Sequence, residues 1–522
     1  MIRVIDIFAG PGGLSEGFSR VKDNRGNRAF DVALSIENEV YAFETLRLRA
    51  FFRQFPDGAP ESYYRFLRGE IGIGALYEGR PLVARESNAK CWHVTLGPGG
   101  APVEEVRNRI SIAVGANDDW VLLGGPPCQA YSLAGRSRNR GNPDYVPGAD
   151  VRQKLYVEYL QILVDHRPAV FIMENVKGLL SATLENEHVF HRILEDLRDP
   201  ATAVTREDLN TPNDRHEGYR IYSLVERRLF ENGNLEGSVI RSEKYGVPQA
   251  RHRVILLGIR DDIHAEMPEI LAPRPTVSVS KVIGHLPKIR SGLSRHRDSG
   301  RSWAEHLHSQ RRSRWANAGA RRVGGPELSD LVRQLLGEVR APVADRGAEF
   351  IHTDVRVDYM ADWYCDPDIG GICNHSSRGH MDKDLYRYFY ASCYARLHGV
   401  SPSLQHFPTD LIPEHTSADI AVEQGGNFSD RFRVQVMGRP STTIVSHISK
   451  DGHYYIHPDP LQCRSLTVRE AARLQTFPDN YFFSGPRTAQ YVQVGNAVPP
   501  YLAKQIADIV YGILSQGGAA AQ

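Results

Sequence analysis

The sequence has no long apolar run, and its N-terminus has no basic flank followed by a cleavage site. The chain of 522 residues is 41% hydrophobic, yet stretches such as 254–259 are far shorter than the roughly 20 apolar residues that span a bilayer. A secretory signal would need a charged start followed by an apolar segment. We therefore expect a cytoplasmic protein without a membrane span. Its length predicts more than one domain.

Cysteine is scarce and never closely paired. The chain has six cysteines and no CxxC pair, whereas disulfide frameworks and structural zinc sites usually need closely spaced cysteines. We expect reduced thiols, any one of which could act as a nucleophile. The six are Cys91, Cys128, Cys365, Cys373, Cys393 and Cys463.

An excess of positive charge is also missing. Lys and Arg number 63 against 62 Asp and Glu, which gives a formal charge of +1. A protein that merely coats nucleic acid needs a strongly basic surface, so this balance argues against that class. The charge balance still allows an enzyme that acts on nucleic acid through a local basic face, because binding depends on how charge is distributed over the surface and not on the net charge.

Apolar runs alternate with glycine turns and helical patterns at the start of the chain. Residues 2–8 form a β-branched run that leads into glycines, an apolar helical pattern follows from about Ser15, and a second run ends at Glu37. Together these make a βαβ unit. Later runs predict further strands at 120–125, 169–175 and 253–259. The predicted fold class is α/β, with a doubly wound, mostly parallel sheet.

This regular pattern weakens from about Asp262 and returns after Pro440. The sequence between them is rich in Arg, Gly, Ser and His, which marks a module inserted into a catalytic domain. Regular structure resumes with TTIVSHI, a helix at about Thr467 to Gln475, and a final helix that opens at Pro500. We predict a first catalytic part at 1–265, an inserted domain at 266–440 and a returning part at 441–522.

The glycine turn DIFAGPGG follows the first predicted strand, which is the usual ligand position in this fold class. A dinucleotide fingerprint needs GxGxxG, and Ser15 takes the third glycine position after Gly10 and Gly12. That absence disfavours a nicotinamide cofactor. Glu37 could accept hydrogen bonds from ribose hydroxyls, and Phe8 could line an adenine pocket.

A second turn, GGPPCQAYS, carries Cys128 directly after the predicted strand at 120–125. Two prolines fix the backbone before this cysteine, so its thiol is aimed at the open edge of the sheet. A lone cysteine is more often a small buried hydrophobe than a nucleophile. Partners change that balance: ENV carries Glu174 at the end of another strand, and QARHR leads into a third with Arg253.

Six sequence blocks occur in one order from Asp6 to Pro500. They are DIFAGPGG, GGPPCQAYS, MENVKG, YGVPQARHRVILLG, SLTVREAARLQTFPD and QVGNAVPP. In content and order they resemble the motifs of the DNA cytosine-5 methyltransferase family, in particular its bacterial Dcm-like members. The resemblance covers most of the chain except the insert. It implies a Rossmann-like fold that uses S-adenosyl-L-methionine, with an inserted target-recognition domain.

The resemblance assigns the chemistry to three residues. Cys128 is the nucleophile that adds to C6 of cytosine, Glu174 holds or protonates N3, and Arg253 grips O2 and orients Glu174. A thiolate bound at C6 makes C5 nucleophilic enough to take a methyl group. Neither carbon can be reached in this way inside a base stack, so the target cytosine must flip out of the duplex.

The resemblance also implies contacts to both substrates. Those to S-adenosyl-L-methionine are Phe8, Gly10, Gly12, Gly13, Glu37, Leu155 and Asn496. Those to duplex DNA are Gln129, Ser132 and Arg251, although Arg251 could as easily be a surface or phosphate-facing arginine as a catalytic one. The basic charge of the insert, described below, adds Arg311, Arg312 and Arg314 as expected DNA contacts. The family's acidic residue on the third strand cannot be placed, because residues 55–117 are unusually long.

The predicted recognition domain begins with a concentration of positive charge. Residues 285–322 carry ten Lys or Arg against only Asp298 and Glu305. A charge run in an arbitrary protein is usually a solvated loop, but at this position neutralisation of phosphates is the better explanation. Trp303 and Trp315 would pack the segment onto the domain.

Cysteines and histidines in the insert invite comparison with zinc sites. The set is Cys365, Cys373, His375, His380 and Cys393. Their spacing, C-x7-C-x-H-x4-H, lacks the short paired intervals of structural zinc sites. We therefore predict no bound metal, and packing or phosphate contacts for His375, Arg378 and His380.

Three other functions stay open. A tRNA cytosine-5 methyltransferase would share the catalytic core, but that branch is compact. An inactive DNA-binding homologue would be expected to lose Cys128 or Glu174, and both are present. A nicotinamide-dependent oxidoreductase would need the missing third glycine. We expect a monomer that acts on double-stranded DNA in association with the nucleoid, and we leave open a cognate restriction-modification system.

Overall fold

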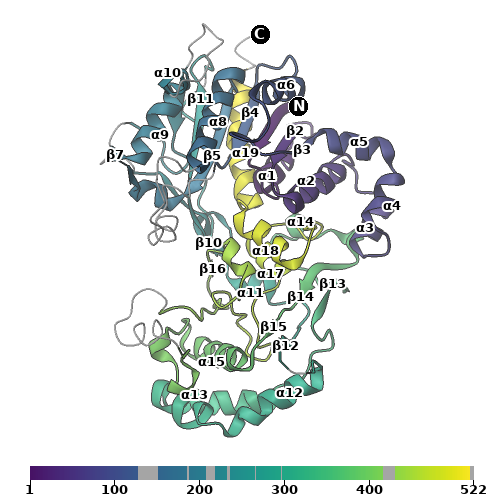
Figure 1. Ribbon diagram of the computed structural model, residues 1–522, viewed down its shortest axis with the longest axis vertical. Helices are drawn as coiled ribbons and strands as arrows, with labels where there is room; N and C mark the ends of the chain where they lie inside the picture. Colours follow the sequence, from purple (N-terminus) through teal and green to yellow (C-terminus); the bar gives the residue numbers. More distant parts are fainter. Residues whose placement is uncertain are drawn as a thin grey trace.

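The computed structural model has two lobes joined by a narrower layer (Figure 1). The upper lobe contains a large sheet, and the lower lobe is mostly helical. The structure describes residues 1–126, 151–184, 187–206, 218–231, 236–264, 266–295, 297–414 and 429–517. Within these ranges no helix combines the length and the apolar character that a membrane crossing requires.

The upper lobe is built on an eight-stranded sheet with the order β3-β2-β1-β4-β5-β11-β8, and β9 also pairs with β11. The strands are β1 (Ile2–Ile7), β2 (Phe30–Glu37), β3 (Cys91–His93), β4 (Trp120–Gly124), β5 (Val170–Val176), β8 (Tyr219–Tyr222), β9 (Val239–Arg241) and β11 (His252–Arg260). Neighbours from β3 to β5 run parallel, whereas β11 is antiparallel to its partners. The predicted α/β class and mostly parallel sheet are confirmed.

The central strands are apolar on both faces because helices cover both. Successive side chains of a strand point to opposite faces: Val4 packs into one core and Ile5 into the other, and Val121 and Leu122 divide in the same way. One layer contains α6 (Val103–Val114), α8 (Val151–His166) and α9 (Val189–Arg198), and the other contains α1 (Gly13–Ser19) and α19 (Pro500–Gly517). The final helix expected from Pro500 is therefore confirmed as α19.

The antiparallel direction of β11 matters for the site. Arg253, near its start, pairs with Val176, and Ile255 pairs with Glu174. Since β5 runs parallel to β4 and β1, the start of β11 lies at the same edge as the carboxyl ends of those strands. Residues that are 79 positions apart in the sequence, Glu174 and Arg253, are thereby brought to one edge.

Extra short helices account for the length of residues 55–117. They are α3 (Glu61–Leu67), α4 (Ile73–Glu78) and α5 (Pro81–Ala89), and they follow α2 (Val40–Phe52). Phe51 of α2 and Tyr63 and Tyr64 of α3 form a buried aromatic cluster between them. This cluster includes Cys373 of the insert, so the added helices also support the layer between the lobes.

The lower lobe has one hydrophobic core under three helices. They are α12 (Gly300–Ser309), α13 (Ala320–Glu338) and α15 (Asp382–His398). Trp303 and Trp315 are 0% and 4% exposed in this core, as expected, so the basic segment is folded rather than a solvated loop. The core also takes in Ile456 and Cys463, beyond residue 440. The domain boundaries at 265 and 440 stay predictions.

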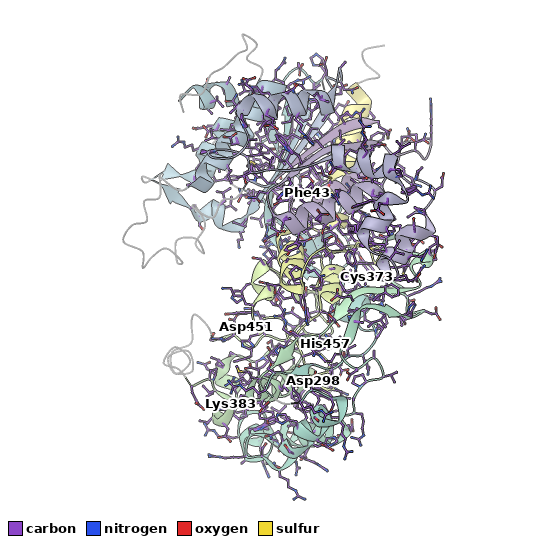
Figure 2. The ribbon with its side chains drawn as sticks, turned by 45° about the vertical axis from the view of Figure 1, so that its right-hand side comes forward. Phe43, Asp298, Cys373, Lys383, Asp451 and His457 are labelled. Atoms are coloured by element: carbon purple, nitrogen blue, oxygen red, sulfur yellow. The ribbon has the colours of Figure 1, made fainter. Side chains whose placement is uncertain are left out.

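The layer between the lobes is held by buried polar side chains. It contains α11 (Val279–Ile283), α17 (Val468–Leu474), α18 (Arg487–Asn496), β13 (Gly347–His352) and β14 (Gly371–Ser376). The helix expected near Thr467 is confirmed as α17, and a capping box between Thr467 and Glu470 explains its start. Arg464 donates to both oxygens of the buried Glu470 carboxylate at 2.7 Å, close to His457 (Figure 2).

The remaining elements are short. They are α10 (Pro200–Arg206), α14 (Ala361–Tyr364), β6 (Thr183–Leu184), β7 (Glu187–His188), β10 (Gln249–Ala250), β12 (Gly292–Leu293), β15 (Gly379–His380) and β16 (Ser441–Thr442). The TTIVSHI run therefore contributes only part of a two-residue strand, followed by a 3-10 turn at Ser446–Ser449. β16 pairs in parallel with β10, which joins the chain returning from the lower lobe to the start of QARHR.

Candidate active site

The carboxyl edge of the sheet gathers Glu174 and Arg253. Glu174 lies near the end of β5 and Arg253 near the start of β11. Arg253 Nε and Glu174 Oε1 form an ion pair at 2.9 Å, with the side chains 13% and 14% exposed. Partial burial strengthens such a pair because less water screens it. The structure thus brings together two of the three residues predicted to carry the chemistry.

The chain leading to Cys128 passes directly beside this pair. A Cβ on Gly125 would lie 3.3 Å from Glu174 Oε2, and a Cβ on Gly124 would lie 2.7 Å from the ring of Tyr159. Gly124 therefore allows a packing contact that a larger residue would disturb, and a side chain at Gly125 would press on the Glu174 carboxylate. The predicted residues Cys128, Gln129 and Ser132 lie outside the described residues.

Arg251 corrects one expectation, because it is not a surface arginine that faces phosphate. Its side chain is 1% exposed. Nη1 donates to the carbonyl oxygens of Ile444 at 2.8 Å and Gly495 at 3.2 Å. Burial and the neighbouring Arg253 guanidinium lower the pKa of Arg251 to about 9. Arg251 thus fastens the chain before β11 to the segment that follows β16 and to the end of α18.

Gln249 is a second buried anchor, which the sequence pattern did not single out. Its side-chain oxygen accepts from the Ile444 N–H at 2.7 Å, and its amide donates to Leu474 O at 3.3 Å and Gln475 Oε1 at 3.1 Å. All of these partners are nearly 200 residues or more away in the sequence. A local sequence signal could not have revealed this role.

Glu37 fixes the glycine turn from the end of β2. Its carboxylate accepts backbone N–H bonds from Gly10 at 2.7 Å, Asn38 at 3.0 Å and Glu39 at 2.8 Å. Burial raises the pKa of Glu37, and the three backbone donors oppose that rise. The carboxylate is therefore already oriented beside the turn that was predicted to bind the cofactor.

The glycines of this turn serve different purposes. A Cβ on Gly13 would lie 2.2 Å from the Val498 carbonyl oxygen, and one on Gly12 would lie 2.8 Å from Leu46. Both therefore allow other parts of the chain to pack closely, and their contact with a cofactor stays a prediction. Gly10 has a φ of +56°, and its Cβ would meet nothing within 4 Å. This open backbone is suited to the close approach of a ligand.

The other predicted cofactor residues lie on separate elements. Phe8 is partly buried with a φ of 53°, Leu155 on α8 lies 3.3 Å from a Cβ position on Gly97, and Asn496 is exposed at the end of α18. The acidic residue sought on the third strand is not in β3, whose residues are 91–93. Instead the His93 ring stacks on Phe43, with centroids 5.1 Å apart (Figure 2 labels Phe43).

Asp6 is a buried carboxyl near the end of β1. It is 1% exposed, and among the described residues its Oδ2 has no hydrogen-bond partner. Burial raises its pKa from 3.8 to about 7, against the opposing effect of a hydrogen bond with Ser15. A carboxyl that titrates near neutral pH at the base of the glycine turn was not predicted, because its burial depends on the surrounding packing.

The basic segment at 285–322 is only partly available to a ligand. Arg290 is 1% exposed and is paired with Asp298 (Figure 2) and Asp345. The predicted phosphate contacts Arg311, Arg312 and Arg314 are exposed, and Arg314 lies 4.0 Å from Asp410. They sit between α12 and α13, which form the outer end of the lower lobe (Figure 1). Their binding to DNA stays a prediction.

The cysteines and histidines of the insert that were compared with zinc ligands lie in separate parts of the structure. Cys373 Sγ lies 3.8 Å from Leu67 O, and Cys393 lies in the lower-lobe core. His375 has hydrogen bonds of 2.9 Å with Thr467 and with Pro287, and burial lowers its pKa to about 4. No group of three or more His, Cys, Asp or Glu in the described part of the chain is placed to hold a metal ion.

Comparison with known proteins shows the family. A model for the C-5 cytosine-specific DNA methylases matches residues 106–201 and 218–511. The type II methyltransferase M.Bpa9945I of Bacillus paralicheniformis is 30% identical over 98% of this chain and 99% of its own length. The type II methyltransferase M.AgeI of Thalassovita gelatinovora is 26% identical over 78% of this chain and 86% of its own.

A third relative comes from Aeropyrum pernix. Its DNA (cytosine-5-)-methyltransferase M.ApeKI is 25% identical over 76% of this chain and 82% of its own. The family model covers most of the chain, and M.Bpa9945I matches it almost from end to end. The chain therefore belongs to the C-5 cytosine-specific DNA methylase family.

Proposed function

We propose that this protein transfers a methyl group from S-adenosyl-L-methionine to C5 of a cytosine flipped out of a specific duplex DNA sequence. The observation that carries the proposal is the Glu174–Arg253 ion pair at the carboxyl edge of the sheet, beside the chain that leads to Cys128. Membership of the C-5 cytosine-specific DNA methylase family supports the same reaction.

The chemistry is divided between a nucleophile and an acid. The Cys128 thiolate forms a bond to C6, and Glu174 donates a proton or a hydrogen bond at N3, so that the ring accepts the electron pair. C5 then takes the methyl group. The C5 proton is then lost to solvent, its electron pair expels the Cys128 thiolate, and the N3 proton returns to Glu174, which restores the ring and the free enzyme.

Arg253 positions both Glu174 and the base. Its Nε lies against the Glu174 carboxylate, and its Nη1 donates to His252 O at 2.9 Å. We assign the remaining nitrogen, Nη2, to the cytosine O2. Because the guanidinium is planar and rigid, one side chain can fix the distance between the carboxylate and the base.

The residues around the glycine turn fit the methyl donor, which supplies the methyl group on its sulfonium. The oriented carboxylate of Glu37 is suited to ribose hydroxyls, and the open backbone at Gly10 allows a close approach. Phe8 would cover the adenine. Leu155 and Asn496 complete the proposed contacts. These residues bind and orient the donor next to the edge that holds Glu174.

Duplex DNA is the proposed substrate, and the lower lobe is the proposed recognition domain. The relatives M.Bpa9945I and M.AgeI are both named type II methyltransferases, which supports a role beside a cognate restriction enzyme. We propose that a monomer carries out the reaction on DNA.

Bisulfite sequencing tests this function directly. DNA is taken from a host that lacks cytosine methylation of its own and expresses the chain. We expect protected cytosines within one short sequence, and none when the host expresses Cys128→Ser. Methylation that persists in Cys128→Ser, or transfer to tRNA but not to DNA in purified reactions, would contradict the proposal.

A further inference from the structure

A short turn at residues 436–439 presents side chains on the lower lobe from a fixed backbone. The Arg439 N–H donates to Val436 O at 3.2 Å, which closes the turn. The N–H groups of Ser280 and Val279 donate to the carbonyl oxygens of Met437 at 3.0 Å and Arg439 at 2.8 Å. The backbone of the turn is therefore already ordered before a ligand binds, which reduces the entropic cost of binding.

This turn is also held close to the catalytic arginine. β16 begins two residues after it, at Ser441, whose N–H donates to Pro248 O at 3.0 Å. The Thr443 hydroxyl donates to Ala250 O at 2.6 Å. Ala250 precedes Arg253 by only three residues, which span at most about 11 Å of chain. The turn thus has a defined position relative to the base that Arg253 would hold.

The turn borders a hollow of about 280 Å³, whose other wall is formed by residues 400–403. Two arginines line it. Arg433 is paired with Asp430 and lies over the ring of Tyr454, 5.5 Å from its centroid. Arg439 is exposed, and within the described ranges its guanidinium makes no ion pair or side-chain hydrogen bond.

The surroundings of Arg439 favour a base over a phosphate. Met437, two residues before it in the turn, and Val400, which lines the same hollow, are 39% and 40% exposed. A phosphate would satisfy the cation and leave these apolar side chains uncovered. In the major groove, guanine offers two acceptors that match the fork of an arginine, and a thymine methyl group can cover apolar side chains.

We propose that Arg439 is a specificity-determining residue that donates two hydrogen bonds to the major-groove edge of a guanine near the target cytosine. The proposal rests on the proposed function and assigns sequence reading to the 436–439 turn. The exposed Arg311, Arg312 and Arg314 have a different part, because phosphates look the same in every sequence.

The test compares wild type with Arg439→Ala after bisulfite sequencing has defined the methylated sequence. One duplex carries that sequence, and a set of duplexes replaces each of its guanines in turn. We expect Arg439→Ala to lower kcat/KM on the first duplex by about tenfold to a hundredfold. On the duplex that lacks the guanine read by Arg439, variant and wild type should have the same kcat/KM. The variant therefore no longer discriminates between guanine and the replacing base at that position.

Arg85→Ala is the matched control. Arg85 is exposed on α5 in the upper lobe (Figure 1), and its replacement by alanine removes one positive charge, as Arg439→Ala does. Its kcat/KM should equal that of wild type on every duplex. An equal loss for Arg439→Ala on all duplexes would mean a phosphate contact, and no loss would mean no contact. Either result overturns the proposal. A wild-type protein that methylates no DNA would overturn the proposed function instead.

Discussion

Burial of Asp6 makes the stability of the fold depend on pH. Its pKa rises from 3.8 to about 7, so between these values the folded protein holds a proton that the unfolded chain has released. The stabilisation from the neutral carboxyl is complete below about pH 4 and is lost as the pH rises to about 7. At about 1.4 kcal/mol for each pKa unit, the whole loss is about 4 kcal/mol.

Asp6→Asn removes this titration and keeps the shape of the neutral carboxyl. We expect the free energy of unfolding of wild type to fall relative to Asp6→Asn by about 3 kcal/mol between pH 5 and pH 8. Urea unfolding followed by tryptophan fluorescence measures both proteins at each pH. Their difference cancels groups that titrate in both, such as His375.

The control is an exposed carboxyl changed in the same way, Asp57→Asn, which should show no such trend. If wild type and Asp6→Asn kept a constant difference from pH 5 to pH 8, Asp6 would be ionised in the folded protein throughout. A large loss of stability in Asp6→Asn at pH 5 would mean that the contribution of Asp6 to the free energy of unfolding comes from its hydrogen bond with Ser15 and not from its charge.

Further predictions concern catalysis and binding. Glu174→Gln should lower kcat by about a hundredfold or more, because an amide cannot supply the proton at N3, with little change in the donor's Kd; normal turnover would refute the acid role. Glu37→Ala should weaken S-adenosyl-L-methionine binding by about tenfold to a hundredfold in calorimetry, and an unchanged Kd would exclude the ribose contact. Neutralising Arg311, Arg312 and Arg314 together should weaken binding to all DNA alike. It should also reduce the slope of log affinity against log salt by about 0.9 for each phosphate that these arginines neutralise in wild type, whereas an unchanged slope would leave them as solvated surface.

The sheet and its ligand edge could be predicted because their signals are local. The β-branched run at 2–8 and the apolar run at 120–125 identify strands. The glycine turn follows the first strand directly, and Glu37 ends β2. The direction of β11 could not be predicted, because an apolar run looks the same in either direction. That direction is what places Arg253 beside Glu174.

The positions of buried polar residues were the hardest feature to predict from the sequence. Arg251 has the composition of a surface residue, and only its bonds to Ile444 and Gly495, far along the chain, show that it is internal. Asp6 is similar, since its raised pKa follows from burial by segments that are distant in the sequence. Long-range contacts of this kind leave no local pattern.

The structure of residues 55–117 could not be predicted for a different reason. Its helices are short and polar on much of their surface, so their periodicity is weak, and β3 has only three residues. In the lower lobe, the order of the basic segment depends on Trp303 and Trp315, whose burial was predicted. The fold of the whole lobe was not.

Covalent trapping tests the reaction most directly. Purified protein is incubated with S-adenosyl-L-methionine and duplex DNA in which the target cytosine is replaced by 5-fluorocytosine, whose C5 fluorine cannot leave as a proton does. We predict a denaturation-resistant adduct between Cys128 and the base, absent in Cys128→Ser. Normal methylation of ordinary DNA without any trapped adduct would contradict the assignment of Cys128 as the nucleophile.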